Sequence, residues 1–174
     1  MAPDGQVRAL LVIGAAGGAL RIVAAFIPYT PESAALEALY AAVDVGMMLG
    51  LIGVHLRTAG RTGVAGFAFF ILALATLASI VGPDPTMFGI DFYRVGASTF
   101  ALALAGYAFA LILARVQAPA AMLWISCALF GVIASLTGSA LAFLAAGVAL
   151  GFGFIAAQAM PTFPSREIES GEGA

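Results

Sequence analysis

The sequence predicts an all-α integral membrane protein, a single six-helix transmembrane bundle with cytoplasmic N- and C-termini. Of its 174 residues, 63% are hydrophobic and only 9% are charged, whereas globular domains are about half apolar and about one-quarter charged. The mean hydropathy of +1.08 indicates the same class. Because one spanning helix needs roughly 20 apolar residues, the chain has room for about six such helices.

Prolines, glycines and short polar segments divide the apolar sequence. A polar tail, residues 1–6, precedes the first span, and the Pro-Tyr-Thr-Pro segment 28–31 ends it, because the residue before a proline is pushed out of the helical region. We expect an arginine-rich turn at 55–61 and a loop around 83–89, where proline and glycine recur. The single transmembrane domain, 7–160, then has approximate spans 7–27, 34–56, 62–82, 90–114, 119–137 and 139–160.

The last third of the chain contains few residues that indicate where one helix ends and the next begins. Residues 116–165 carry no charge, and a run of about 50 residues is too long for one spanning helix. We therefore expect Thr137-Gly138-Ser139 to separate the fifth span from the sixth. The tail 161–174 is acidic and is expected to be disordered.

The arginines predict the orientation. With the N-terminus in the cytoplasm, most arginines fall on the cytoplasmic side, as the positive-inside rule requires: Arg8, Arg57, Arg61, Arg115 and Arg166. We expect a multi-pass protein of the cell inner (plasma) membrane. The lysine-free composition, rich in alanine, glycine and arginine, is typical of bacteria with GC-rich genomes.

Residue counts exclude several chemistries. All seven basic residues are arginines, so no lysine amine can form a Schiff base with retinal or pyridoxal phosphate. The single histidine, His55, excludes a bis-histidine haem site within one chain, and the single cysteine, Cys127, excludes an intrachain disulfide or a cysteine-based zinc site. We expect no cofactor and no metal, and the absence of a basic patch argues against nucleic acid.

The second span carries three ionisable residues, Glu37, Asp44 and His55. Their spacings of seven and eleven residues place them on one helix face. Charges at membrane depth are costly and often functional. We therefore predict a polar pocket in the outer half of the membrane, between the first, second and fourth spans. Its expected ligand-binding residues are Arg21, Glu37, Tyr40, Asp44, Asp91 and Arg94.

A purely structural interpretation competes with this pocket. Arg21 would pair with Asp44 or Glu37, and Asp91 with Arg94, only to neutralise their charges. His55 is expected at the cytoplasmic interface, bound to a carbonyl or a headgroup. A proton relay from Asp44 to His55 would have to bridge about 16 Å along the helix.

Three functions remain open. The first is binding or transport of a small amphiphile or ion, with a homodimer expected because the chain is short for a transporter. The second is an acid–base enzyme, an isomerase, cyclase or hydrolase, acting on a lipid or isoprenoid, with Asp44 as the catalytic acid and Glu37 or Asp91 as partner. The third is an interaction or assembly subunit that presents Gly14 and Gly18 to partner helices.

Overall fold

The computed structural model describes residues 4–28, 30, 33–81, 86–87 and 90–159, with residues 86–87 and 90–94 described by their backbone alone. The described part contains five α-helices and one short antiparallel hairpin. The helices are α1 (Asp4–Ala25), α2 (Ala34–Ser79), α3 (Phe92–Leu113), α4 (Ala118–Thr137) and α5 (Ala140–Ala159). The hairpin pairs β1 (Thr86–Met87) with β2 (Ile90–Asp91).

All five helices contain segments long and apolar enough to cross a membrane. A helix of 20 residues, such as α4 or α5, is about 30 Å long and matches the hydrocarbon core of a bilayer. Large apolar side chains are exposed on the outside of the bundle, for example Val64 on α2 and Leu136 on α4. In a bilayer such side chains contact lipid. The helical, apolar bundle is therefore that of a multi-pass membrane protein.

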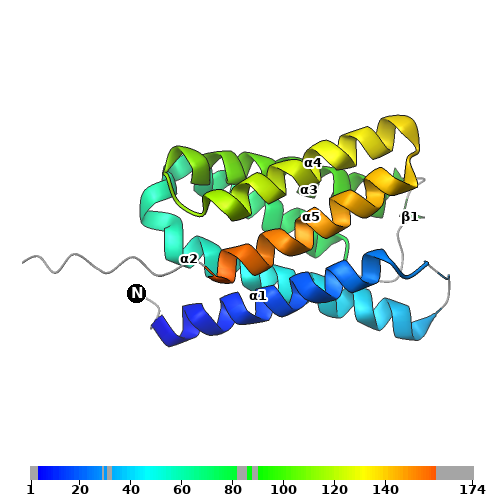
Figure 1. Ribbon diagram of the computed structural model, residues 1–174, viewed down its shortest axis with the longest axis horizontal. Helices are drawn as coiled ribbons and strands as arrows, with labels where there is room; N and C mark the ends of the chain where they lie inside the picture. The colour runs from blue at the N-terminus through cyan, green and yellow to red at the C-terminus, as the bar shows by residue number, and fades with distance from the viewer. Residues whose placement is uncertain (1–3, 29, 31–32, 82–85, 88–89, 160–174) are drawn as a thin grey trace, which may run out of the picture.

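The longest helix, α2, covers both the second and the third predicted span. It has 46 residues and, if straight, would be about 69 Å long, more than twice the thickness of a bilayer core. Instead it is bent at Gly63, the one residue within α2 with non-helical angles (φ 63°, ψ −164°). Figure 1 shows the chain reversing direction through this bend. Residues 55–61, which were predicted to form the turn, are helical instead. The chain changes direction at Gly63, because glycine readily adopts the positive φ that this change needs.

Other boundaries differ from the prediction by a few residues. The helix α1 begins within the predicted tail 1–6, with Asp4 in its first turn, where a carboxylate favours the helix dipole. Residues 90–91, expected in the fourth span, belong to β2. At the expected break, 137–139, Gly138 ends α4 in the left-handed conformation (φ 68°). The tail 161–174 lies outside the described residues.

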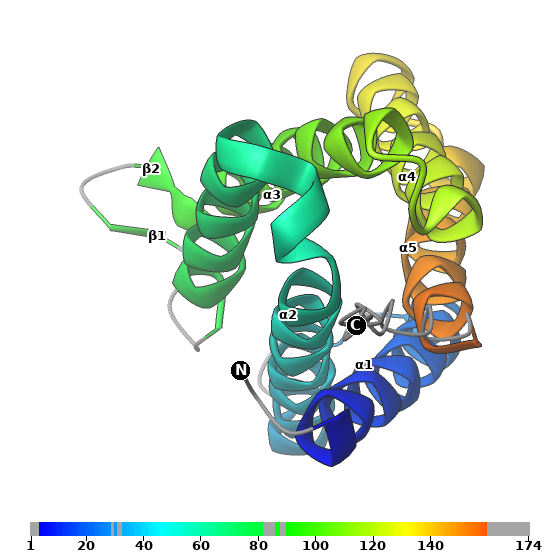
Figure 2. The ribbon, with the colours of Figure 1, turned by 90° about the vertical axis from the view of Figure 1, so that its left-hand side faces the viewer.

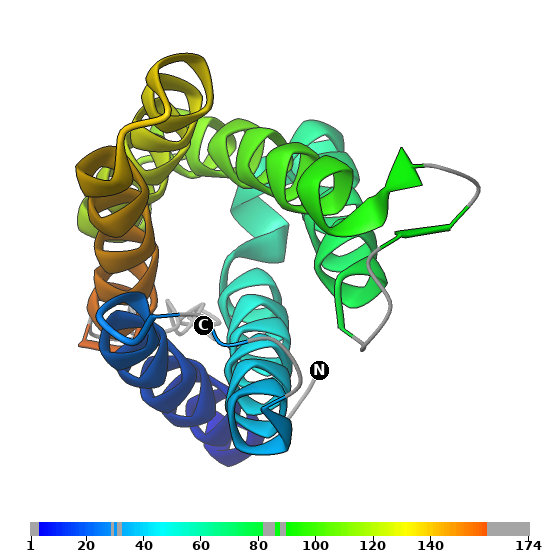
Figure 3. The ribbon, with the colours of Figure 1, turned by 90° about the vertical axis from the view of Figure 1, so that its right-hand side faces the viewer.

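The helices form a ring in chain order, which Figures 2 and 3 show from its two ends. Each helix packs against its neighbours in sequence, and α5 closes the ring by packing against α1. The start of α1, the bend of α2, the α3–α4 connection and the end of α5 lie at one end of the bundle (Figure 1). We call this the basic end, because it holds Arg8, Arg57, Arg61 and Arg115. The opposite end, with β1 and β2, is the hairpin end.

Glycines let α1 approach α2 and α5 closely. Gly14 faces Gly50, Gly17 faces Gly46, and Gly18 faces a backbone carbonyl of α5. A Cβ on Gly17 would lie 2.9 Å from the carbonyl carbon of Gly46, closer than packed carbon atoms lie (about 3.5–4.0 Å). The glycine face of α1, expected to serve partner helices, is thus used inside the chain.

Candidate functional site

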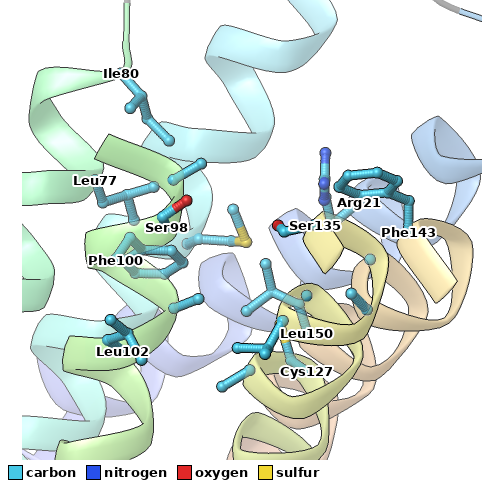
Figure 4. A pocket seen from close by; sticks show the side chains of 18 of the residues that line it. Arg21, Leu77, Ile80, Ser98, Phe100, Leu102, Cys127, Ser135, Phe143 and Leu150 are labelled. Atoms are coloured by element: carbon cyan, nitrogen blue, oxygen red, sulfur yellow. The ribbon is translucent and has the colours of Figure 1, made fainter. Parts of the chain in front are cut away.

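A cavity of about 350 Å³ lies within the ring and is lined by residues from all five helices (Figure 4). This volume falls in the range of small-molecule pockets, roughly 300–1,000 Å³. Five polar residues contribute to its wall: Arg21 on α1, Asp44 on α2, Ser98 on α3, and Cys127 and Ser135 on α4. The predicted pocket involved only the helices that became α1, α2 and α3, whereas α4 and α5 supply much of this cavity.

The rest of the wall is apolar. Met47 and Leu77 come from α2, Phe100 from α3 and Leu150 from α5, and all four are buried. In Figure 4, Arg21 and Ser135 lie to one side of the cavity, and Leu77, Ser98 and Phe100 to the other. The cavity therefore combines a large apolar surface with a small number of polar groups, as binding sites for organic molecules do.

Arg21 owes its position to the close packing of α1 against α5. It follows Gly18 by one turn, and Gly18 lies against the backbone of Gly151. Opposite the arginine is Gly147, where a Cβ would lie 3.7 Å from the Nε and Nη2 atoms of Arg21. The half-buried guanidinium therefore fits against bare backbone, and its Nε is buried without a hydrogen-bond partner. A buried donor without an acceptor costs free energy, which makes this group available for a ligand.

Asp44 is half-buried on α2, one residue after the fully buried Val43. Arg21 is near enough to attract this carboxylate electrostatically. Nevertheless, in the part of the chain that the structure describes, no ion pair within 4.0 Å joins the two residues. The structural interpretation, in which Arg21 pairs with Asp44 or Glu37, is not met by a direct Arg21–Asp44 salt bridge, and both side chains border the same cavity.

The other predicted site residues lie away from the cavity or outside the described side chains. Glu37 is exposed and Tyr40 is half-buried, and neither lines the cavity. The side chains of Asp91 and Arg94 lie outside the described residues. Glu37 shares a helix face with Asp44, but seven residues along a helix correspond to about 10 Å, so the two carboxylates are at different depths.

Sequence reasoning did not single out the α4 wall of the cavity. Cys127, Gly131 and Ser135 all line it. They are spaced by four residues, which places them on one helix face. This stripe of small and weakly polar residues was the available signal, although it is also typical of ordinary helix packing. Gly131 is the notable member, because a Cβ there would meet no atom within 4 Å.

A second polar cluster lies at the basic end of the bundle. Arg57 on α2 donates a hydrogen bond to the carbonyl oxygen of Ala157 near the end of α5. In the amide orientation that satisfies both groups, Gln117 Oε1 accepts from Arg57 Nε at 3.1 Å. Gln117 is buried and caps the start of α4 with a left-handed backbone (φ 55°). Arg57 therefore ties α2, α4 and α5 together.

His55 and Tyr107 belong to the same end. The His55 ring stacks on Phe70 with 4.0 Å between ring centroids, so it packs between the two arms of α2. It is only 8% exposed, whereas the sequence suggested an interfacial histidine. Thr58 Oγ1 donates to the carbonyl of Val54 at 2.7 Å, so the Tyr107 hydroxyl, 3.1 Å away, is the donor to Thr58.

No family model, curated protein or solved structure matches this chain. Within the described residues, no group of three or more histidine, cysteine, aspartate or glutamate side chains is arranged to hold a metal ion. The function must therefore be inferred from the chemistry of the cavity.

Proposed function

We propose that this chain is a multi-pass protein of the cell inner membrane that binds or transports a small amphiphile in the cavity within its ring of helices. The observation that carries the proposal is one cavity of about 350 Å³ that combines mainly apolar walls with Arg21 and Asp44. An amphiphile is the class of ligand that complements both kinds of surface. A bare ion would leave most of this wall without a partner.

The position of the cavity fits a ligand that arrives from the bilayer. Several apolar residues that border it are also largely exposed, among them Leu102 (62%) on α3, Leu136 (81%) on α4 and Phe143 (56%) on α5. An apolar molecule dissolved in the lipid would therefore meet apolar side chains at the rim before it met the charges. Entry along this route requires no aqueous channel.

We further propose six membrane crossings: α1, the two arms of α2, α3, α4 and α5. An even number of crossings is consistent with the start of α1 and the end of α5 lying at the same end of the bundle (Figure 1). Because the basic end holds Arg8, Arg57, Arg61 and Arg115, the positive-inside rule places that end in the cytoplasm. Arg21 and Asp44 would then lie in the outer half of the membrane.

No described observation favours the two alternative functions. Acid–base catalysis by a carboxylate pair needs a second acid near Asp44, and among the described residues that line the cavity there is none. An assembly subunit was suggested by the glycines of α1, which already pack against α2 and α5.

The test is retention of a ligand by the full-length protein and by one matched pair of variants. Gly131→Phe fills the cavity, because Gly131 lines it and has open space around its Cβ position. Gly60→Phe is the control: Gly60 is also helical, also has open space, and does not line the cavity.

Each protein in mild detergent is incubated with a lipid and metabolite extract, washed, and analysed by native mass spectrometry. We expect the same added mass on the wild type and on Gly60→Phe, and none on Gly131→Phe. Equal retention by all three proteins, or retention by none, would refute the proposal.

A further inference from the structure

We infer that the ligand of this cavity is a small zwitterion with an apolar body, whose negative group binds Arg21 and whose positive group binds Asp44. The inference rests on the proposed function and specifies its ligand. It starts from the observation that two opposite charges border one cavity without forming an ion pair in the described part of the chain.

The first step is the need of each charge for a partner. A charged group removed from water is costly unless it is paired and hydrogen-bonded. Arg21 is half-buried against Gly147, and its Nε lacks an acceptor. Asp44 is half-buried too, and among the described residues none donates a hydrogen bond to its carboxylate. Each residue therefore has capacity for one ligand group of opposite sign.

The second step is charge balance. A ligand with only a negative group would satisfy Arg21 but would bring a like charge towards Asp44. A ligand with only a positive group would satisfy Asp44 and repel Arg21. In a site of low dielectric constant both repulsions are strong, whereas a zwitterion offers each residue an opposite charge.

The third step is the apolar body. Buried apolar side chains such as Met47, Phe100 and Leu150 also line the cavity. They complement an aromatic or aliphatic group of the ligand. The volume of about 350 Å³ suits a single small molecule, and an apolar amino acid is the simplest probe that carries all three features.

The experiment compares three probes that share a phenylethyl body. Phenylalanine carries both charges, phenethylamine only the positive one, and 3-phenylpropanoate only the negative one. Binding to the full-length wild-type protein is measured by isothermal titration calorimetry in mild detergent at neutral pH. We expect phenylalanine to bind at least about tenfold more tightly than either analogue, because a site built for a polar group rejects ligands that lack it.

Two variants test which residue binds which charged group of the ligand. Arg21→Met should remove the preference for phenylalanine over phenethylamine, and Asp44→Asn should remove the preference over 3-phenylpropanoate. The wild-type comparison decides the inference even if a variant fails to fold.

An analogue that binds as tightly as phenylalanine would overturn the zwitterion and leave the amphiphile cavity standing. Absence of binding by all three probes would also overturn it. The proposed function fails separately, when the wild type retains nothing from the extract or when Gly131→Phe retains as much as the wild type.

Discussion

The hydrogen bonds of Arg57 provide a sharp test of the packing at the basic end. Arg57 donates to the Ala157 carbonyl and to Gln117, and so connects α2 with α5 and α4. Replacing it with methionine keeps an unbranched apolar stem of similar length and removes the guanidinium. We predict that Arg57→Met lowers the free energy of unfolding, because it leaves two acceptors without their donor.

The magnitude follows from these two bonds. Hydrogen bonds to charged groups contribute about 1.5–3 kcal/mol each in soluble proteins, whereas polar bonds between membrane helices average about 0.6 kcal/mol. Arg57 is half-buried, so a value near 1 kcal/mol per bond is reasonable. The expected loss is about 2 kcal/mol, or roughly a thirtyfold change in the unfolding equilibrium.

Trp124 makes the measurement straightforward. It is the only tryptophan in the chain and is fully buried, so its fluorescence reports unfolding during titration of dodecyl-maltoside micelles with sodium dodecyl sulfate. Arg8→Met is the control, because Arg8 is exposed on α1 and such changes usually stay within about 0.5 kcal/mol. If Arg57→Met were no more destabilising than Arg8→Met, the proposed connection would be wrong.

Three further predictions use the same fluorescence titration. Gly63→Ala should destabilise the protein by about 1–3 kcal/mol, because few residues other than glycine adopt its backbone angles; Gly60→Ala, in ordinary helix, should be neutral or stabilising, and equal effects would contradict the bend. Gly17→Leu should cost more than 2 kcal/mol, roughly as overpacked cores do, since its Cβ would lie 2.9 Å from the backbone of α2; a neutral result would mean that the two helices are not in contact. Tyr107→Phe should cost about 1 kcal/mol for one lost hydrogen bond, and an unchanged stability would show that the bond contributes nothing.

The sequence was sufficient to predict the class and the approximate extent of most helices. Hydropathy is a property of consecutive residues, so it can be read from the sequence without knowledge of the fold. A charge-free run therefore indicates a spanning helix, and a glycine such as Gly138 indicates where that helix ends. The position of the bend in α2 could not be predicted in this way. Segment 55–61 has the composition of a turn, but Gly63 is the residue that adopts non-helical angles, because the packing of the two arms decides where the chain reverses.

The site was predictable only in part. Arg21 and Asp44 stood out because charges are rare in apolar helices, and both border the cavity. Whether they touch depends on helix rotations and translations of a few ångströms, which residue spacing does not determine. The helical periodicity predicted that Glu37 and Asp44 lie on the same face of the helix. Glu37 is nevertheless exposed, because a shared helix face does not determine how far along the helix axis the packed part of the bundle extends.

The α4 and α5 walls were harder still to predict. Cys127 and Leu150 carry no charge and sit in helices whose composition is uniform. Their proximity to Arg21 follows from closure of the ring, a contact between segments more than a hundred residues apart. Only the assembled bundle shows it.

The most direct test of the cavity uses Cys127, the single cysteine of the chain. Cys127 lines the cavity and is buried, so its reaction with methyl methanethiosulfonate reports whether the cavity is occupied. The rate is measured by mass spectrometry with and without the most tightly binding probe of the phenylalanine series.

At a probe concentration ten times the dissociation constant, about one-eleventh of the sites are free. We therefore predict that modification slows by about tenfold in the wild type and in Gly60→Phe. In Gly131→Phe it should be slow with or without the probe. A wild-type rate that does not change while the probe is bound would show that the ligand lies elsewhere, and it would contradict the central claim.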